Sequence, residues 1–235
     1  RIQYDYDEKF FVSASYRRDA SSRFHPDNRW GNFGSVGLAW LINKENFMSN
    51  VSWIDMLKFK ASYGIQGNDN LGNYYAYADQ YSVTNSNGDF AVSFSYKGNK
   101  DITWETSYAF NTGFDFELLG NRLNGTVEYF NRKTVDLLYN QPVPISMGYA
   151  TIPMNVGSIV NQGIEVDLNG VLYKNNNIEW LANINATHYK NKITDLAESA
   201  KRNGGIKYSN AIYRVGGSLY NSYLPVYAGV DPNDG

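Results

Sequence analysis

The chain has 235 residues, with 21 Lys and Arg residues against 23 Asp and Glu residues, a net charge of −2 and no Cys. This charge balance lacks the basic footprint of nucleic-acid-binding proteins, and without Cys the chain has no disulfides, thiolate catalysis or Cys-ligated zinc. The longest apolar run covers 36–42, whereas a transmembrane helix needs about 20 apolar residues. The aromatic content of 16% favours strands and membrane interfaces.

In chain order, alternating apolar and polar residues predict about eight strands, because successive side chains of a strand point to opposite faces. The predicted strands cover 2–4, 10–17, 35–42, 57–65, 107–118, 122–129, 164–172 and 178–186. We expect one helical turn at 44–48. Most of these runs are near the length of about 9–11 residues that a tilted strand needs to cross a membrane, against about 5–6 in soluble sheets.

The links between the predicted strands alternate in length. Short links fall at 6–8, 119–122 and 174–177 with a medium link at 43–55, and long polar links fall at 19–31, 67–103, 133–155 and from 192 onward. Up-and-down strands place successive links at opposite ends, so the long links gather at one end, as in outer-membrane barrels. We therefore predict an all-β fold of antiparallel, up-and-down transmembrane β-barrel strands. A soluble antiparallel sheet with one wet face is the alternative.

The alternation also assigns each side chain of the predicted barrel to lipid or to the lumen. The residues expected to face lipid are Tyr108, Phe110, Phe114, Phe116, Val127, Leu168 and Ile184. The residues expected to face the lumen are Asp115, Glu117, Glu128, Glu165, Asp167 and Glu179. Paired carboxylates also serve glycosidases, but a barrel lumen is normally polar, so we interpret this set as part of the wall.

Motifs for bond chemistry are absent from the sequence, including a phosphate-binding loop, a nucleophile elbow and a His-Glu-x-x-His pair. His25 and His188 lie far apart in the sequence, and we expect neither to bind a metal. Residues 231–235 lack the bidentate Glu of a calcium loop and are expected to form a turn. The sequence therefore predicts no enzyme, no cofactor and no metal site.

A tyrosine-rich stretch at 73–82 is the candidate binding loop. Tyr74, Tyr75, Tyr77 and Tyr81 could stack on sugar rings or peptide side chains, because Tyr offers an apolar face and a polar tip. Asp79 and Gln80 could add hydrogen bonds. The alternative is that these side chains pack the long loop against itself or against a partner.

Several stretches, in order along the chain, resemble the SusC/RagA family of TonB-linked outer-membrane proteins from Bacteroidetes. They are Arg18–Phe24 followed by Trp30–Val36, Leu57–Gly64 followed by Gly67-Asn68, Tyr129–Leu138, and Asn155–Glu165. Within the first, 19–23 could tie down a long loop through Asp–Arg pairing and Ser-to-backbone bonds, or it could be a solvated loop. Within the last, Gly157 and Gly163 predict either a close backbone approach or a simple bulge.

This resemblance implies a roughly 22-stranded barrel around a plug, with 1–235 inside that single barrel domain. We expect the signal peptide, the plug and the TonB-contacting segment to lie outside these residues. The resemblance also implies a bacterial outer-membrane importer of oligosaccharides or peptides that works with a SusD-like surface lipoprotein and the TonB complex. Two other interpretations stay open, namely a complete eight-stranded barrel acting as an adhesin or structural protein, and a soluble β-rich carbohydrate-binding module.

The plug gives the predicted lumen carboxylates a possible role. Most of them lie within a few residues of the short links and would form an acidic zone in the periplasmic half of the barrel. We hypothesise that this zone contacts basic groups on the plug. A hydrated acidic wall without such contacts is the alternative.

Overall fold

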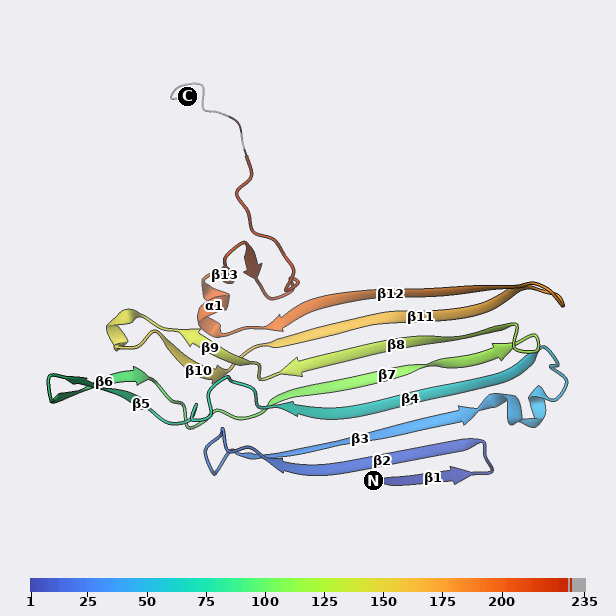
Figure 1. Ribbon diagram of the computed structural model, residues 1–235, viewed down its shortest axis with the longest axis horizontal. Coiled ribbons are helices and arrows are strands. Elements are labelled where there is room, and N and C mark those ends of the chain that lie inside the picture. The colour runs from blue at the N-terminus through green and yellow to red at the C-terminus, as the bar shows by residue number, and fades with distance from the viewer. Residues whose placement is uncertain (228, 230–235) are drawn as a thin grey trace.

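The main element of the protein is an antiparallel eight-stranded sheet (Figure 1), seen in a computed structural model that describes residues 1–227 and 229. The strand order is β1-β2-β3-β4-β7-β8-β11-β12, so each sheet strand pairs with the next one along the chain. Their bounds are β1 Ile2–Tyr6, β2 Phe10–Ala20, β3 Trp30–Leu41, β4 Ile54–Asn68, β7 Glu105–Leu118, β8 Leu123–Val135, β11 Ser158–Lys174 and β12 Glu179–Asp195. The predicted antiparallel strands are confirmed, and several are longer than the apolar pattern indicated.

The short links form one end of the sheet. After β1, Asp7 and Glu8 adopt positive φ angles of 53° and 47°, and the Glu8 amide donates to the Asp5 carboxylate at 3.1 Å. Such left-handed residues allow a tight reversal. The medium link holds the 3-10 helices η1 (Ile42–Lys44) and η2 (Asn46–Met48), which confirms the helical turn predicted there.

The long links lie at the opposite end of the sheet (Figure 1). Three of them carry two-stranded hairpins, which the apolar pattern of the sequence did not indicate. These elements are β5 Gln80–Ser86 with β6 Asp89–Tyr96, β9 Leu138–Pro142 with η3 Ile145–Met147 and β10 Thr151–Asn155, and α1 Glu198–Arg202 with β13 Ile206–Tyr208 and β14 Ala211–Tyr213. The turn predicted at 231–235 lies outside the described residues.

One face of the sheet is apolar and open to the surroundings. In one row of paired residues across the sheet, Phe10 pairs with Trp40, Trp40 with Phe59, and Phe59 with Phe114. Phe110 is 40% exposed and Ile184 is 58% exposed, so this face is not the interior of a soluble sandwich. The largest fully buried side chains among the described residues lie instead at or near the loop end of the sheet, at Phe24, Ile102, Pro153 and Ile193.

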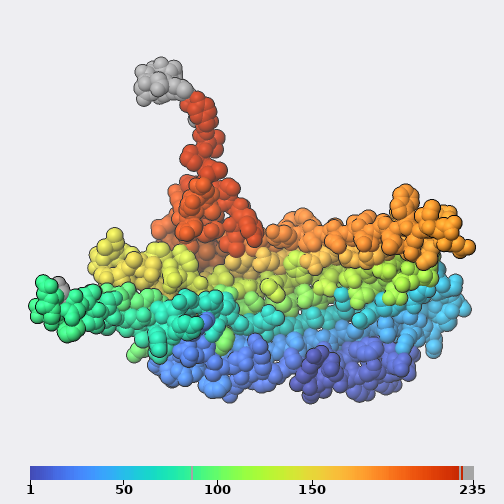
Figure 2. Space-filling view, in the orientation of Figure 1, coloured from blue at the N-terminus to red at the C-terminus, as the bar shows by residue number. Residues whose placement is uncertain are grey.

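The sheet is open, because β1 and β12 are its two edges and no strand pairing joins them within the described chain. A complete eight-stranded barrel therefore does not form from these strands. Figure 2 shows the sheet as an elongated slab from whose loop end the β5–β6 hairpin extends. No helix within 1–227 is long and apolar enough to cross a bilayer.

The glycines singled out in the sequence have different roles. At Gly163, a Cβ atom would meet the carbonyl oxygen of His188 on the neighbouring strand, so the close approach of the two backbones requires glycine here. Gly157 has a φ of +87° and precedes the register shift at Ser158 and Ile159. The close backbone approach is therefore realised at Gly163, whereas the register shift next to Gly157 has its extra residue, Thr194, in β12.

Candidate functional site

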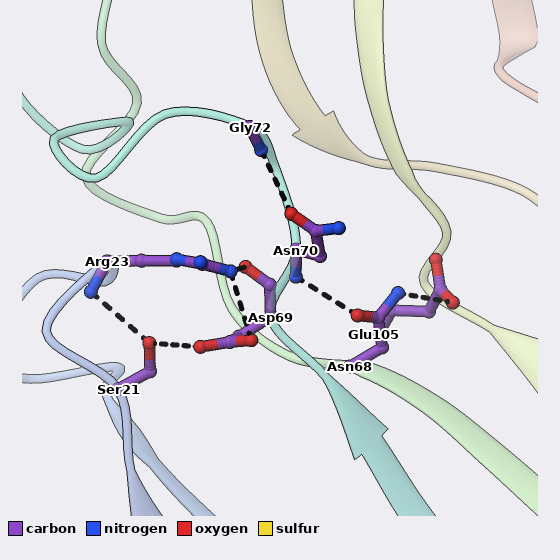
Figure 3. Close-up of polar contacts among 7 residues, drawn as sticks. All are labelled: Ser21, Arg23, Asn68, Asp69, Asn70, Gly72 and Glu105. Carbon is purple, nitrogen blue, oxygen red and sulfur yellow. Dashed lines mark hydrogen bonds and ion pairs between the residues drawn. The ribbon is translucent and has the colours of Figure 1, made fainter.

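Polar side chains at the loop end form a network that we call the loop clamp, made of Ser21, Arg23, Asn68, Asp69, Asn70 and Glu105 (Figure 3). The Ser21 hydroxyl donates to the Asp69 carboxylate at 2.6 Å. The Arg23 guanidinium donates to both the carboxylate and the backbone carbonyl of Asp69 at 3.2 Å. Since Ser21 follows β2 and Asp69 follows β4, the clamp joins two links that are far apart in sequence.

Glu105 extends the loop clamp to a third link. Its carboxylate accepts a hydrogen bond from the Asn68 side chain at 3.2 Å and another from the Leu138 amide at 3.1 Å. Nearby, the Asn155 side chain accepts from the Thr103 amide at 2.8 Å and donates to the Thr103 carbonyl at 2.8 Å. These bonds fix the starts of β7 and β9 against the end of β10.

A small apolar core lies beside the loop clamp. Phe24 is fully buried and packs edge-on against Trp104 with ring centroids 5.5 Å apart. Trp104 also packs against Phe33 at 5.2 Å, and its indole N–H donates to the Arg29 carbonyl at 3.0 Å. The first long link is therefore anchored by a packed core rather than left as a solvated loop.

The prediction that 19–23 ties down a long loop is confirmed for the Ser-to-backbone bond, but the Asp–Arg ion pair forms between different partners. The Arg23 amide donates to the Ser21 hydroxyl at 3.2 Å, which is the expected Ser-to-backbone bond. Arg23 pairs with Asp69 instead of Asp19, and Asp19 pairs with Arg17 at 3.0 Å. Sequence reasoning did not identify Asp69 as the partner of Arg23. Asp69 directly follows Gly67-Asn68, which is one of the stretches that carry the family resemblance.

Two of the candidate binding tyrosines are open to solvent beside the loop clamp. Tyr74 is 66% exposed and Tyr75 is 62% exposed. The Arg23 guanidinium lies 4.8 Å from the centre of the Tyr74 ring, which holds that ring by a cation–π contact. Tyr77 is half-buried and packs edge-on against His25 at 5.9 Å. The arrangement leaves Tyr74 and Tyr75 free to meet a ligand, while Tyr77 contributes to loop packing.

The remaining candidates in this segment belong to the β5–β6 hairpin. Tyr81 lies on β5 and packs against Phe94 of β6 with ring centroids 5.5 Å apart. The Asp79 carboxylate pairs with Lys97 at 2.9 Å and accepts from the Gly98 amide at 2.9 Å. The Lys97 hydrogen bond is the main cause that lowers the pKa of Asp79 below its ordinary value. Asp79 therefore fastens the base of the hairpin.

The polar face of the sheet carries the predicted lumen carboxylates, and two of them are neutralised within the sheet. The Lys60 ammonium group lies 2.9 Å from Asp115 and 3.0 Å from Glu128. Thr126 donates to Asp115 at 3.0 Å, and Lys58 lies 3.8 Å from it. Sequence reasoning placed the acids correctly on one face but overlooked that these β4 lysines share that face and lie next to them.

The other carboxylates of this set differ in their partners. Asp167 accepts hydrogen bonds from Asn169 at 2.8 Å and Asn185 at 3.0 Å. Glu179 pairs with Lys174 at 2.7 Å beside the short turn. Glu165 is exposed and lies directly opposite Glu128 in the register. Glu117 makes no ion pair with any described residue.

The residues predicted to face lipid share the apolar face of the sheet. Phe114 pairs with Val127 across β7 and β8, and Leu168 pairs with Ile184 across β11 and β12. Tyr108, Phe110 and Phe116 alternate along β7 on the same side as Phe114. The arrangement supplies one continuous apolar surface and one polar surface, while contact with lipid stays a prediction.

Comparison with known proteins identifies the family of this fold. The family model described as "TonB dependent receptor-like, beta-barrel" matches residues 1–233. TonB-dependent receptor P39 of Formosa agariphila is 36% identical over 95% of this chain and 21% of its own length. TonB-dependent receptor SusC of Bacteroides thetaiotaomicron is 33% identical over 83% of this chain and 20% of its own length.

A solved structure gives the same relation in three dimensions. The structure of the RagAB peptide transporter matches with a TM-score of 0.88 at 31% sequence identity, covering 97% of this chain and 25% of the matched chain. The chain thus spans about a fifth to a quarter of the relatives it matches. With this match over nearly its whole length, the chain belongs to the TonB-dependent receptor-like β-barrel family.

Proposed function

We propose that this chain forms part of the wall of a bacterial outer-membrane importer that takes up oligosaccharides or peptides with energy from the TonB complex. The observation that carries the proposal is the sheet itself, with long strands that are apolar on one face and polar on the other. In lipid every backbone N–H and C=O must be paired, so spanning β-structure takes the form of a closed barrel. The open edges of β1 and β12 would accordingly pair with further strands of the same barrel.

Membership of this family also supports a number of strands for the whole barrel. Related transporters have about 22 strands around a plugged lumen, and the eight sheet strands described above would make up a part of that wall. Residues 1–235 would then belong to one barrel domain, with the plug and the TonB-contacting segment in other parts of the protein. The polar face would border the plug and the cargo, and the apolar face would contact lipid.

The loop end would face the cell exterior, since outer-membrane barrels have long extracellular loops and short periplasmic turns. There the exposed rings of Tyr74 and Tyr75 could stack on cargo. A SusD-like surface lipoprotein is the proposed partner at this end, supported by the likeness to SusC and to the RagAB transporter. The barrel would perform no bond chemistry of its own.

The test uses the full-length receptor that contains this segment. Its gene would be deleted in the native bacterium, and uptake of fluorescently labelled oligosaccharides and peptides would be measured. We expect uptake of one cargo class to be lost on deletion, restored by the wild-type gene, and lost again in a strain without TonB. Recovery of the receptor outside the outer-membrane fraction, or uptake that does not depend on TonB, would contradict the proposal.

A further inference from the structure

The charged residues on the outward, apolar face of the eight strands are basic, apart from one aspartate at the end of β12. Reading the pairing registers across the sheet, this face contains Arg18, Lys133, Lys190 and Lys192. The aspartate is Asp195, which lies opposite Ser158 beyond a register shift and pairs with Lys201 at 2.7 Å. The carboxylates of the strand interiors lie on the polar face, which holds both signs of charge. Because Asp195 is paired with Lys201, the unpaired charges on the outward face of these strands are basic.

Three of these residues gather on neighbouring strands, and we call them the outer lysine patch, made of Lys133, Lys190 and Lys192. Lys133 pairs with Val160, and Val160 pairs with Lys192, so both lysines lie in one row across β8, β11 and β12. Adjacent strands lie about 4.8 Å apart, so the backbones at these two lysines are roughly 10 Å apart. Lys190 is on the same face two residues before Lys192. One ligand with two anionic groups could therefore contact the whole patch.

The patch carries no internal neutralisation. Each of its lysines is exposed, and none makes an ion pair with a described residue, whereas Lys60 on the opposite face binds two carboxylates. Two outward neighbours of the patch, Asn131 and Gln162, are uncharged and bond to each other at 3.1 Å, and the outward acid Asp195 is already paired with Lys201. A partner for the patch would therefore come from outside the described residues.

The height of the patch on the sheet indicates where that anion lies. The row of Lys133 and Lys192 continues through Tyr108 and Ile65 to Tyr16 on β2. Tyr16 is 70% exposed, and outward tyrosines mark the level of lipid headgroups. Below this row, toward the short turns, the outward face becomes apolar. The patch therefore lies at the upper rim of the apolar band, on the side of the long loops.

We infer that the outer lysine patch binds the phosphate groups of a lipid headgroup in the outer leaflet, an inference that rests on the proposed outer-membrane function. Lysine binds phosphate as a compact point charge with several donors. Clustered basic residues at a membrane surface bind anionic headgroups. A lipid that offers two phosphates and acyl chains would match both the lysines and the apolar band below them.

The test measures binding of purified diphosphoryl lipid A to the full-length receptor in detergent, with dephosphorylated lipid A and inorganic phosphate as comparison probes. Each Lys→Gln substitution in the patch should weaken binding of the phosphorylated lipid about five-fold, and all three together on the order of a hundred-fold. The matched control replaces Lys9, Lys44 and Lys174 by Gln, which changes the charge equally at the short-turn end. Lys→Arg substitutions in the patch should retain binding.

Each outcome decides the inference. Equal lipid affinity of the patch variant and the control variant would overturn it, and so would competition by inorganic phosphate at millimolar concentration, because the lipid would then be dispensable. If the Gln variant fails to fold, the lipid affinity of the wild-type receptor is measured at low and at high salt. Binding through lysines predicts a lower affinity at high salt, so an affinity that does not fall contradicts the inference. Wild-type receptor that inserts into the outer membrane without preferring phosphorylated lipid overturns only this inference, whereas failure to insert overturns the proposed function as well.

Discussion

Phe114→Arg tests whether the apolar face of the sheet contacts lipid. Phe114 is 43% exposed, and its ring lies 5.3 Å from that of Phe59. An outward Arg near the middle of the bilayer costs about 2–4 kcal/mol, and loss of the aromatic pair adds about 0.5–1.5 kcal/mol. We expect the variant to lose about 3–5 kcal/mol of folding free energy in lipid vesicles. The measurement is denaturant unfolding followed by tryptophan fluorescence, with heat-modifiable gel mobility as a second readout.

Two control variants separate lipid contact from general damage to the strand. Asn111→Arg places the same charge on the polar face of the same strand, and it should cost much less because that face would border water. Phe114→Leu keeps the position apolar and should cost less than about 1.5 kcal/mol. Wild-type stability of Phe114→Arg, or an equal loss in Asn111→Arg, would refute the assignment of the two faces.

Other predictions follow from the loop end and from the polar face. Asp69→Ala removes the shared partner of Ser21 and Arg23 in the loop clamp, so protease cleavage of the first two long links should increase, whereas Asp89→Ala at the start of β6 should leave it unchanged. Lys97 lowers the pKa of Asp79 below its ordinary value of 3.8. The stabilisation of the hairpin by ionised Asp79 is therefore present above pH 3.8 and is lost as the pH falls below that value. Hydrogen exchange of the β5 amides should accordingly be faster at pH 3 than at pH 5, relative to the intrinsic rates at each pH. Replacing Tyr74 and Tyr75 together by Ala should weaken cargo binding by about 1–3 kcal/mol in all, taking roughly 0.5–1.5 kcal/mol for each stacked ring; unchanged affinity would exclude them from the site.

The strands could be predicted from the sequence where one face is strictly apolar. The run at 107–118 gives β7 almost to its observed bounds, Glu105–Leu118, because its apolar residues alternate along the whole run with Thr112 as the single interruption. The run at 178–186 underestimates β12, which continues to Asp195, because Lys190 and Lys192 take outward positions that an apolar pattern assigns to hydrophobic residues. The pattern therefore ends where the apolar band ends, while the strand itself continues.

The loop end was less predictable because its contacts join distant parts of the chain. Arg23 lies in a stretch that the sequence singled out and Asp69 directly follows another, Gly67-Asn68, yet nothing in local periodicity pairs one with the other. The β5–β6 hairpin has a local signal in the Asn87-Gly88 pair, because Asn-Gly favours tight hairpin turns. These residues adopt positive φ angles of 55° and 95° in the turn. This signal lies inside a link that is polar overall, so the apolar pattern alone did not indicate the hairpin.

The ion pairs of the polar face narrow the hypothesis that the acidic zone contacts the plug. Asp115 and Glu128 already share Lys60, and Lys58 lies 3.8 Å from Asp115, so a plug cation that approached them would meet two carboxylates that two lysines already neutralise. Glu165 lies opposite Glu128 and makes no ion pair with the described residues, and like charges that face each other across strands are destabilising. A basic group from the plug would relieve that repulsion most effectively at Glu165. The physical case for plug contact therefore rests on Glu165 of β11 and on Glu117 of β7, which has no ion pair among the described residues, whereas Asp115 and Glu128 belong to the internal electrostatics of the sheet.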